Sequence, residues 1–131
     1  LGGTEPTLTD AALVLGYLNA EFFLGGTMKL DFESSRAVIK NKVADPLGLG
    51  VPEAAAAIVS VITENMVQAI SEITVNQGID PENAILIGGG GAAGLNSIWI
   101  ARRLGCPSVL GQFARNKKAR VLERSGPGLL N

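Results

Sequence analysis

The sequence predicts an α/β domain in which helices outnumber strands and the sheet is small. An apolar segment, residues 84–87, is followed by four glycines and then by a helical pattern up to Leu104. This order is typical of a strand, a tight turn and a helix. A second short segment, Ser108–Gly111, reads as another strand, so residues 84–111 are expected to form one βαβ unit. Helical patterns fill most of the chain before it.

Two helices are expected in the first third of the chain. Thr9 is the predicted N-cap of a helix over residues 10–18, and Asp31 is the predicted N-cap of a helix over residues 32–44. Pro46 should end the second helix, because proline lacks the backbone N–H that a helix interior needs.

The longest helix is expected over residues 52–77, with a proline in its first turn and Gly78 ending it. At about 1.5 Å per residue it would be close to 40 Å long. The strand at 84–87 is apolar throughout, which predicts burial on both faces. Phe22 and Phe23, in the turn region between the first two helices, are also expected to be buried.

Composition excludes several classes of function. The chain has 131 residues, is 47% apolar and carries a net charge of −1, so it lacks the basic excess of a dedicated nucleic-acid binder. It has no uninterrupted apolar run of the roughly 20 residues that cross a bilayer, and no signal-peptide pattern. No nucleic-acid or membrane partner is therefore expected. Since a single cysteine cannot form an internal disulfide, a reducing, cytoplasmic location is predicted.

Missing residue types narrow the chemistry further. The chain has no histidine, so it cannot build a Ser-His or Cys-His nucleophile pair. One cysteine and no histidine also exclude an ordinary structural zinc site, and no metal ligand is predicted. Cys106 is more simply explained as a small apolar residue than as a reactive thiol.

The glycine turn at residues 88–91 is the strongest candidate for a site, because a helix N-terminus carries unpaired N–H groups and glycine lets a ligand approach the backbone. It suits a nucleotide or phosphate, although glycine could also serve close packing alone. Gly89, Gly91 and Gly94 match G-x-G-x-x-G. A dinucleotide fold would place an acidic residue about 20 positions later, whereas the next acid is Glu123, which disfavours NAD binding.

Several segments, taken together, resemble the hydantoinase/oxoprolinase family. Residues 2–11, GGTEPTLTDA, resemble the family's GG-x-x-P-T-x-T-D-A segment. Residues 23–31 resemble the segment that follows it in the family. Glu64-Asn65-Met66 with Ala69-Ile70, then Gly78-x-Asp80-Pro81 and the glycine turn, keep the family's order and spacing. The resemblance covers about residues 1–111.

The resemblance implies part of one lobe of an actin-like or sugar-kinase-like ATPase fold, with ATP in a cleft between two lobes. Residues 1–111 would be part of a hydantoinase A-like ATPase domain, and residues 112–131 form a tail with no assigned role. Residues 92–96 resemble the acetophenone-carboxylase branch, and an asparagine stands where many members have histidine. The cofactor-binding residues implied by the resemblance are Gly88, Gly89, Gly90, Gly91, Ala92 and Asn96.

The implied function is that of a nucleotide-binding lobe in an ATP-dependent cyclic-amide hydrolase, of hydantoinase or 5-oxoprolinase type, or in a related carboxylase. ATP and Mg²⁺ would act in the full-length protein, and the catalytic residues are not identified. The implied partners are the rest of the ATPase domain and a hydantoinase B-like subunit or domain. The alternative is a helical scaffold or interaction module whose glycine turn is purely structural.

The chain opens on a loop-like segment, GGTEPT, and is expected to be a piece of a longer enzyme. Such a piece should bind nucleotide weakly and should not hydrolyse it. Apolar surface left open by the missing lobe should favour self-association. The basic residues between Arg115 and Arg124 are interpreted as a solvated surface rather than as an anion site.

Overall fold

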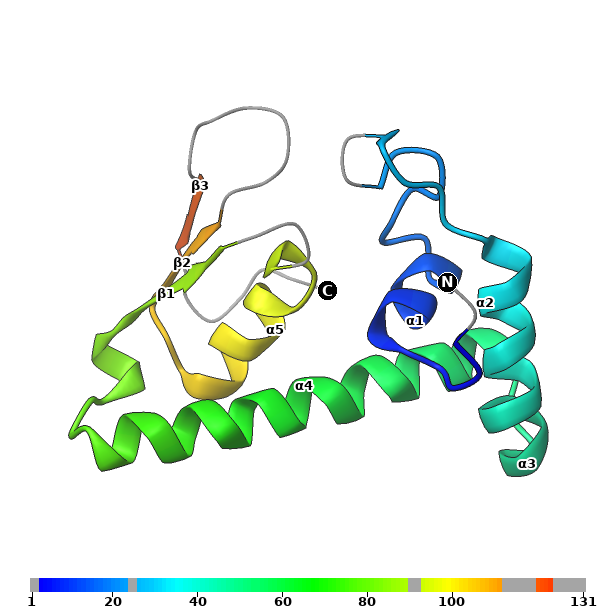
Figure 1. The fold of residues 1–131 in the computed structure, drawn as a ribbon. Coiled ribbons are helices and arrows are strands. Elements are labelled where there is room, and N and C mark those ends of the chain that lie inside the picture. Colours follow the sequence, from blue (N-terminus) through cyan, green and yellow to red (C-terminus); the bar gives the residue numbers. More distant parts are fainter. Residues whose placement is uncertain (1–2, 24–25, 90–92, 112–119, 124–131) are drawn as a thin grey trace. The chain divides into compact units, whose positions relative to one another are not determined.

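The chain forms two compact units, Leu1–Ile62 and Thr63–Asn131. A long helix, α4 (Val51–Asn76), contributes to both units (Figure 1). The computed structural model describes residues 3–23, 26–89, 93–111 and 120–123. Within these residues helices predominate and a three-stranded sheet is present, which confirms the predicted helix-rich α/β class with a small sheet.

The first unit is built from helices. Its elements are α1 (Leu8–Val14), α2 (Phe32–Ile39), a π-helical turn (Lys40–Ala44), α3 (Asp45–Leu47) and the first part of α4. Four of the five residues in its core cluster are alanines, which allow the helices to approach closely; the cluster is Ala11, Ile39, Ala44, Ala54 and Ala55. Ile39 is the largest side chain that is completely buried in the described part of the chain.

The first helix begins earlier than predicted, because Thr7 rather than Thr9 is its N-cap. The Thr7 hydroxyl accepts a hydrogen bond from the Asp10 N–H at 3.3 Å. The Asp10 carboxylate in turn accepts one from the Thr7 N–H at 2.8 Å. This reciprocal capping box needs an acidic or amide side chain three residues after the cap. Thr7 has Asp10 at that position, whereas Thr9 has Ala12.

Asp31 caps α2, as predicted, but the prediction that Pro46 ends the helical segment is wrong. Helical backbone continues through Pro46 because a π-helical turn precedes it, in which the Asp45 N–H donates to the carbonyl of Lys40. Pro46 thus lies in the first turn of α3, where a missing N–H costs little. Gly48, with φ of 65°, ends the segment instead.

Helix α4 matches its predicted bounds within one residue, and Gly78, with φ of 68°, follows it. By length and composition alone it is long and apolar enough to cross a membrane, although only 17% of its most apolar window is buried. Glu64 in this helix is nevertheless paired with Arg103 of α5 (Ala93–Leu104). We therefore interpret α4 as a packing helix.

The second unit contains the sheet and the predicted βαβ unit, which is confirmed. Its elements after α4 are a 3₁₀ turn (Pro81–Asn83), β1 (Ile85–Gly88), α5 (Ala93–Leu104), β2 (Ser108–Gly111) and β3 (Arg120–Glu123). The strand order is β1-β2-β3, with β1 and β2 parallel and β2 and β3 antiparallel. Helix α5 ends at Gly105, which has φ of 75°.

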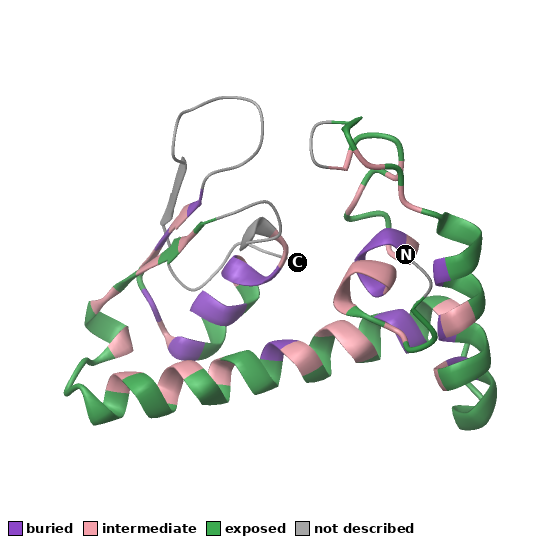
Figure 2. Cartoon of the chain, in the orientation of Figure 1, coloured by how far each residue is buried: buried purple, intermediate pink, exposed green. Residues whose placement is uncertain are grey.

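Helix α5 covers one face of the sheet, where most of the buried residues of this unit lie (Figure 2). Leu86 of β1 packs against this core, which consists of Ile100, Ala101, Leu104, Cys106 and Val109. Ile85 and Ile87 alternate with Leu86 and are 62% and 71% exposed. The prediction that this strand is buried on both faces is wrong for the described residues, because alternate side chains of a strand point to opposite faces.

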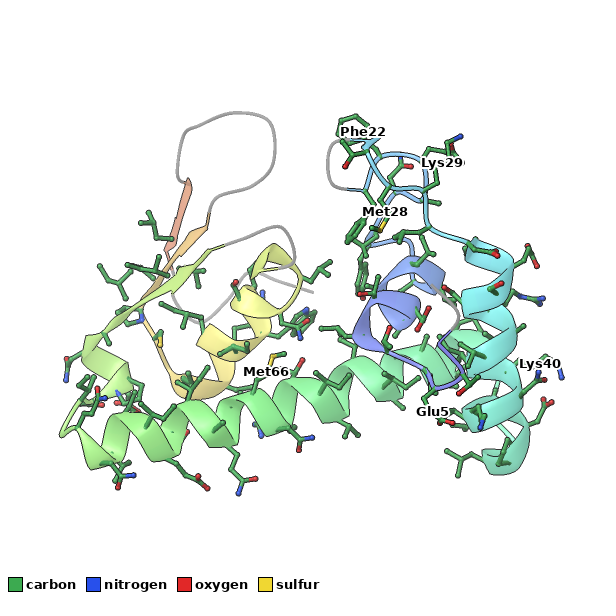
Figure 3. The ribbon with its side chains drawn as sticks, in the orientation of Figure 1. Glu5, Phe22, Met28, Lys29, Lys40 and Met66 are labelled. Atoms are coloured by element: carbon green, nitrogen blue, oxygen red, sulfur yellow. The ribbon has the colours of Figure 1, made fainter. Side chains whose placement is uncertain are left out.

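The burial predicted for Phe22 is also wrong, since its side chain is 40% exposed (Figure 3). Phe23 is half-buried and forms an isolated β-bridge with Met28. Gly26, with φ of 89°, lies in the turn between Phe23 and Met28. Phe22 lies in a bend, where its N–H donates to the carbonyl of Asn19, so its ring is not packed into the core.

Candidate functional site

Two glycines lie side by side where the parallel strands end. In the register of β1 and β2, the Cα of Gly88 pairs with that of Gly111. Ligands of open α/β sheets bind outside the carboxyl ends of parallel strands. We call Gly88, Gly89 and Gly111 the glycine edge. Without side chains, this backbone is open to close approach by a ligand.

The surroundings of Gly89 show whether close packing alone requires glycine at this position. A Cβ atom at this position would meet no described heavy atom within 4 Å, and its φ is not in the left-handed region. Neither the backbone conformation nor the described packing therefore requires glycine here. This open space leaves room at Gly89 for a ligand or for a part of the protein beyond the described residues.

The remaining glycine-turn residues predicted to bind the cofactor, Gly90, Gly91 and Ala92, lie outside the described residues. Their role stays a prediction. The described backbone resumes at Ala93, the first residue of α5. The turn predicted to bind nucleotide thus joins the glycine edge to the N-terminus of a 12-residue helix.

Asn96, in the first turns of α5, is 5% exposed. Its Nδ2 donates to the sulfur of Met66, in α4, at 3.7 Å. Ser97 and Thr63 are also buried polar residues of this unit. Sequence reasoning named Met66 only as part of the family-like segment Glu64-Asn65-Met66 and did not single out Ser97 or Thr63. Only the packing of α4 against α5 reveals where these residues lie.

Strand β3 brings one basic residue to the glycine edge. Its antiparallel register pairs the Cα of Arg120 with that of Gly111. The basic residues of the tail were interpreted as a solvated surface, and the register adds that the backbone of Arg120 lies beside Gly111. The sequence alone did not predict this pairing, because the order of residues does not show that β3 turns back along β2. Residues 115–119 and Arg124 lie outside the described residues.

No group of three or more metal-ligating side chains occurs among the residues that the structure describes. Arg102 and Arg103 lie in the last turn of α5, at the end opposite the glycine turn. Candidate catalytic residues are not apparent here either.

Cys106 fits the structural role predicted for it. The residue is buried against the core beneath the sheet. Burial raises the pKa of its thiol, since a thiolate is poorly solvated there. The thiolate is the reactive form, so a raised pKa makes this cysteine a poor nucleophile.

Comparison with known proteins places these features in a wider context. The family model described as Hydantoinase/oxoprolinase matches residues 1–119. The acetophenone carboxylase gamma subunit of Aromatoleum aromaticum is 46% identical over 92 residues, which cover 70% of this chain and 13% of that protein.

Two solved structures share the fold. The ATP-dependent caprolactamase from Pseudomonas jessenii superposes with a TM-score of 0.76 and 41% identity, over 84% of this chain and 16% of that one. Acetone carboxylase, in a nucleotide-free structure concerned with ATP-dependent acetone carboxylation, gives a TM-score of 0.71 and 35% identity, over 79% of this chain and 15% of that one. The chain thus spans about one-seventh of the length of these proteins.

Proposed function

The chain belongs to the hydantoinase/oxoprolinase family, and we propose that it forms part of the ATP-binding domain of an ATP-dependent enzyme. The family resemblance noted in the sequence is confirmed, including its likeness to the acetophenone carboxylase branch. One solved relative is an ATP-dependent caprolactamase, and another takes part in ATP-dependent acetone carboxylation. Both names support an ATP-dependent amide hydrolase or carboxylase as the full-length enzyme.

The glycine edge is the observation that carries this proposal. Two parallel strands end there in glycine, and Gly89 has open space where its side chain would be. We assign this edge, with Gly90, Gly91 and Ala92, to the adenosine side of an ATP site. Asn96, the other residue predicted to bind the cofactor, lies buried in the first turns of α5.

The wider assignment follows from the family. Residues 1–111 are proposed to be part of one lobe of an actin-like ATPase domain. The rest of that domain would supply the second half of the cleft and the carboxylates that bind Mg²⁺. ATP would activate a carbonyl or bicarbonate oxygen by phosphoryl transfer. This chain would contribute binding and orientation of the nucleotide.

The name of one relative indicates that related proteins work together with other subunits. Acetophenone carboxylase gamma is a subunit of a larger enzyme. We therefore propose that the full-length protein works with a second, hydantoinase B-like subunit or domain.

A single substitution tests the site. In the full-length enzyme, Gly89→Val should raise the Kd for ATP at least about tenfold, because the new side chain occupies space that the ligand needs. Its melting temperature should stay within about 2 °C of the wild type, because a Cβ there meets no described atom. Ala57→Val, at an exposed position of α4, is the matched control and should leave ATP affinity unchanged.

Isothermal titration with ATP and thermal unfolding give both readouts. Unchanged affinity in a folded Gly89→Val enzyme would refute the adenosine assignment. It would favour the alternative in which the glycine turn is only structural.

A further inference from the structure

Two residues of α4 that lie close together in the sequence hold α5 near both of its ends. The Glu64 carboxylate pairs with the Arg103 guanidinium through two contacts, Nε to Oε1 at 2.6 Å and Nη2 to Oε2 at 2.7 Å. The sulfur of Met66 accepts the Asn96 amide at 3.7 Å. Figure 3 shows the Met66 side chain on the side of α4 that faces α5.

The two contacts lie near opposite ends of the same helix. Arg103 is in the last turn of α5, which spans Ala93–Leu104, and Asn96 is near its beginning. We call Glu64, Met66, Asn96 and Arg103 the α4–α5 clamp.

The apolar packing of α5 is uneven along its length. Its buried apolar residues, Ile100, Ala101 and Leu104, all lie in the C-terminal half. Near the glycine turn, the contact between Asn96 and Met66 joins α5 to α4. This contact therefore contributes to the position of the first turns of α5.

The chemistry of the contact also fixes the side chain of Asn96. A thioether sulfur has lone pairs but no hydrogen, so it can only accept. The NH₂ end of the Asn96 amide must face Met66, and the carbonyl end is turned away from it. An aliphatic residue in place of Met66 would fill a similar volume but would not select one orientation of the amide.

We propose that Met66 and Glu64 are positioning residues, which hold α5 so that the glycine turn at its N-terminus is correctly placed for nucleotide. This inference rests on the proposed function and extends it to the Glu64-Asn65-Met66 segment, to which that function gave no role. Both side chains of the Glu64–Arg103 pair are about half exposed. Exposed ion pairs contribute little to stability, so the role should appear in nucleotide binding rather than in folding.

Substitutions at Met66 test the first contact in the full-length enzyme. Met66→Leu keeps the apolar volume and removes the acceptor, and should raise KM for ATP about three- to tenfold, the usual effect of losing one hydrogen bond. Met66→Gln restores an acceptor and should return KM to within about twofold of the wild type. In both variants kcat and the melting temperature should change little, since no reacting group is removed.

Glu64→Gln tests the second contact and should raise KM for ATP about two- to threefold. Glu21→Gln is its matched control, because Glu21 forms an ion pair with Lys29 that is also exposed and lies in the other unit. This control should leave KM unchanged.

A double substitution tests whether Met66 acts through Asn96. If it does, Met66→Leu combined with Asn96→Ala should raise KM no further than Asn96→Ala alone. Additive effects would overturn the inference. So would an unchanged KM in Met66→Leu, or a raised KM that Met66→Gln fails to restore.

The substitutions distinguish a failure of this inference from a failure of the proposed function. If Gly89→Val weakens ATP binding while Met66→Leu does not, the ATP site stands and the clamp is refuted. If Gly89→Val leaves ATP binding unchanged, the site itself is refuted.

Discussion

Replacing Asp10 by alanine should destabilise the packing of α1 against α2 by about 2–4 kcal/mol. One carboxylate oxygen of Asp10 accepts from the Thr7 N–H at 2.8 Å and from the Thr7 hydroxyl at 2.6 Å. The other accepts from the hydroxyl of Ser35, in α2, at 2.6 Å. Asp10 therefore both caps its own helix and joins it to the next one.

The expected destabilisation is the sum of two losses, that of the capping box and that of the hydrogen bond to Ser35. Loss of an N-terminal cap costs about 1 kcal/mol, with a range of about 0.5–2. Ser35 is buried, and a buried hydroxyl left without its partner costs about 1–3 kcal/mol. Asp10→Asn keeps an acceptor oxygen and a similar shape, so it should cost only about 1 kcal/mol.

Amide hydrogen exchange in the full-length enzyme measures this effect locally, which matters because a large protein does not unfold in two states. In Asp10→Ala, peptides covering α1 and α2 should exchange about 30- to 1,000-fold faster, since each 1.4 kcal/mol is tenfold. Peptides covering α5 serve as the internal reference and should exchange at the wild-type rate.

A second substitution identifies the cause. In the Asp10→Ala background, Ser35→Ala removes the hydroxyl that was left without a partner, so exchange should become no faster. The reasoning would be refuted if Asp10→Ala accelerated exchange less than about fivefold, or if Ser35→Ala added a full further loss.

Two further predictions concern titratable groups. Although partial burial alone would raise the pKa of Asp10, hydrogen bonds from Ser35 and Thr7 lower it below its usual value of 3.8. Its stabilisation of α1 should therefore be present above about pH 4 and disappear as the pH falls through the lowered pKa. In a thermal-unfolding series from pH 2 to 6, the stability of Asp10→Asn should fall less with decreasing pH than that of the wild type. Burial raises the pKa of the Cys106 thiol, so alkylation of this residue, followed by peptide mass spectrometry at pH 7.5, should be at least about tenfold slower than in guanidinium-unfolded protein. Equal rates in the folded and unfolded protein would contradict its burial.

Local signals in the sequence predicted much of the fold. Asp31 as a cap, Gly78 and Gly105 as helix ends, and the βαβ unit were all correct, because each depends on residues close together in the chain. The errors at Thr9 and Pro46 arose where two local signals competed. Thr7 and Thr9 are both suitable caps, and only the reciprocal bond with Asp10 favours Thr7.

By itself, the sequence determined the family, through several short motifs in one order, and the position of the glycine turn. It also showed that these 131 residues contribute no histidine to a site. These conclusions need only residue identity and spacing.

The tertiary structure decided which distant residues meet. It paired Gly88 with Gly111, placed the backbone of Arg120 beside them, and brought Met66 to Asn96, 30 residues away. It also left one face of β1 exposed among the described residues, although every residue of that strand except its glycine is strongly apolar. Strand register and helix packing depend on the simultaneous fit of many side chains, which no short stretch of sequence specifies.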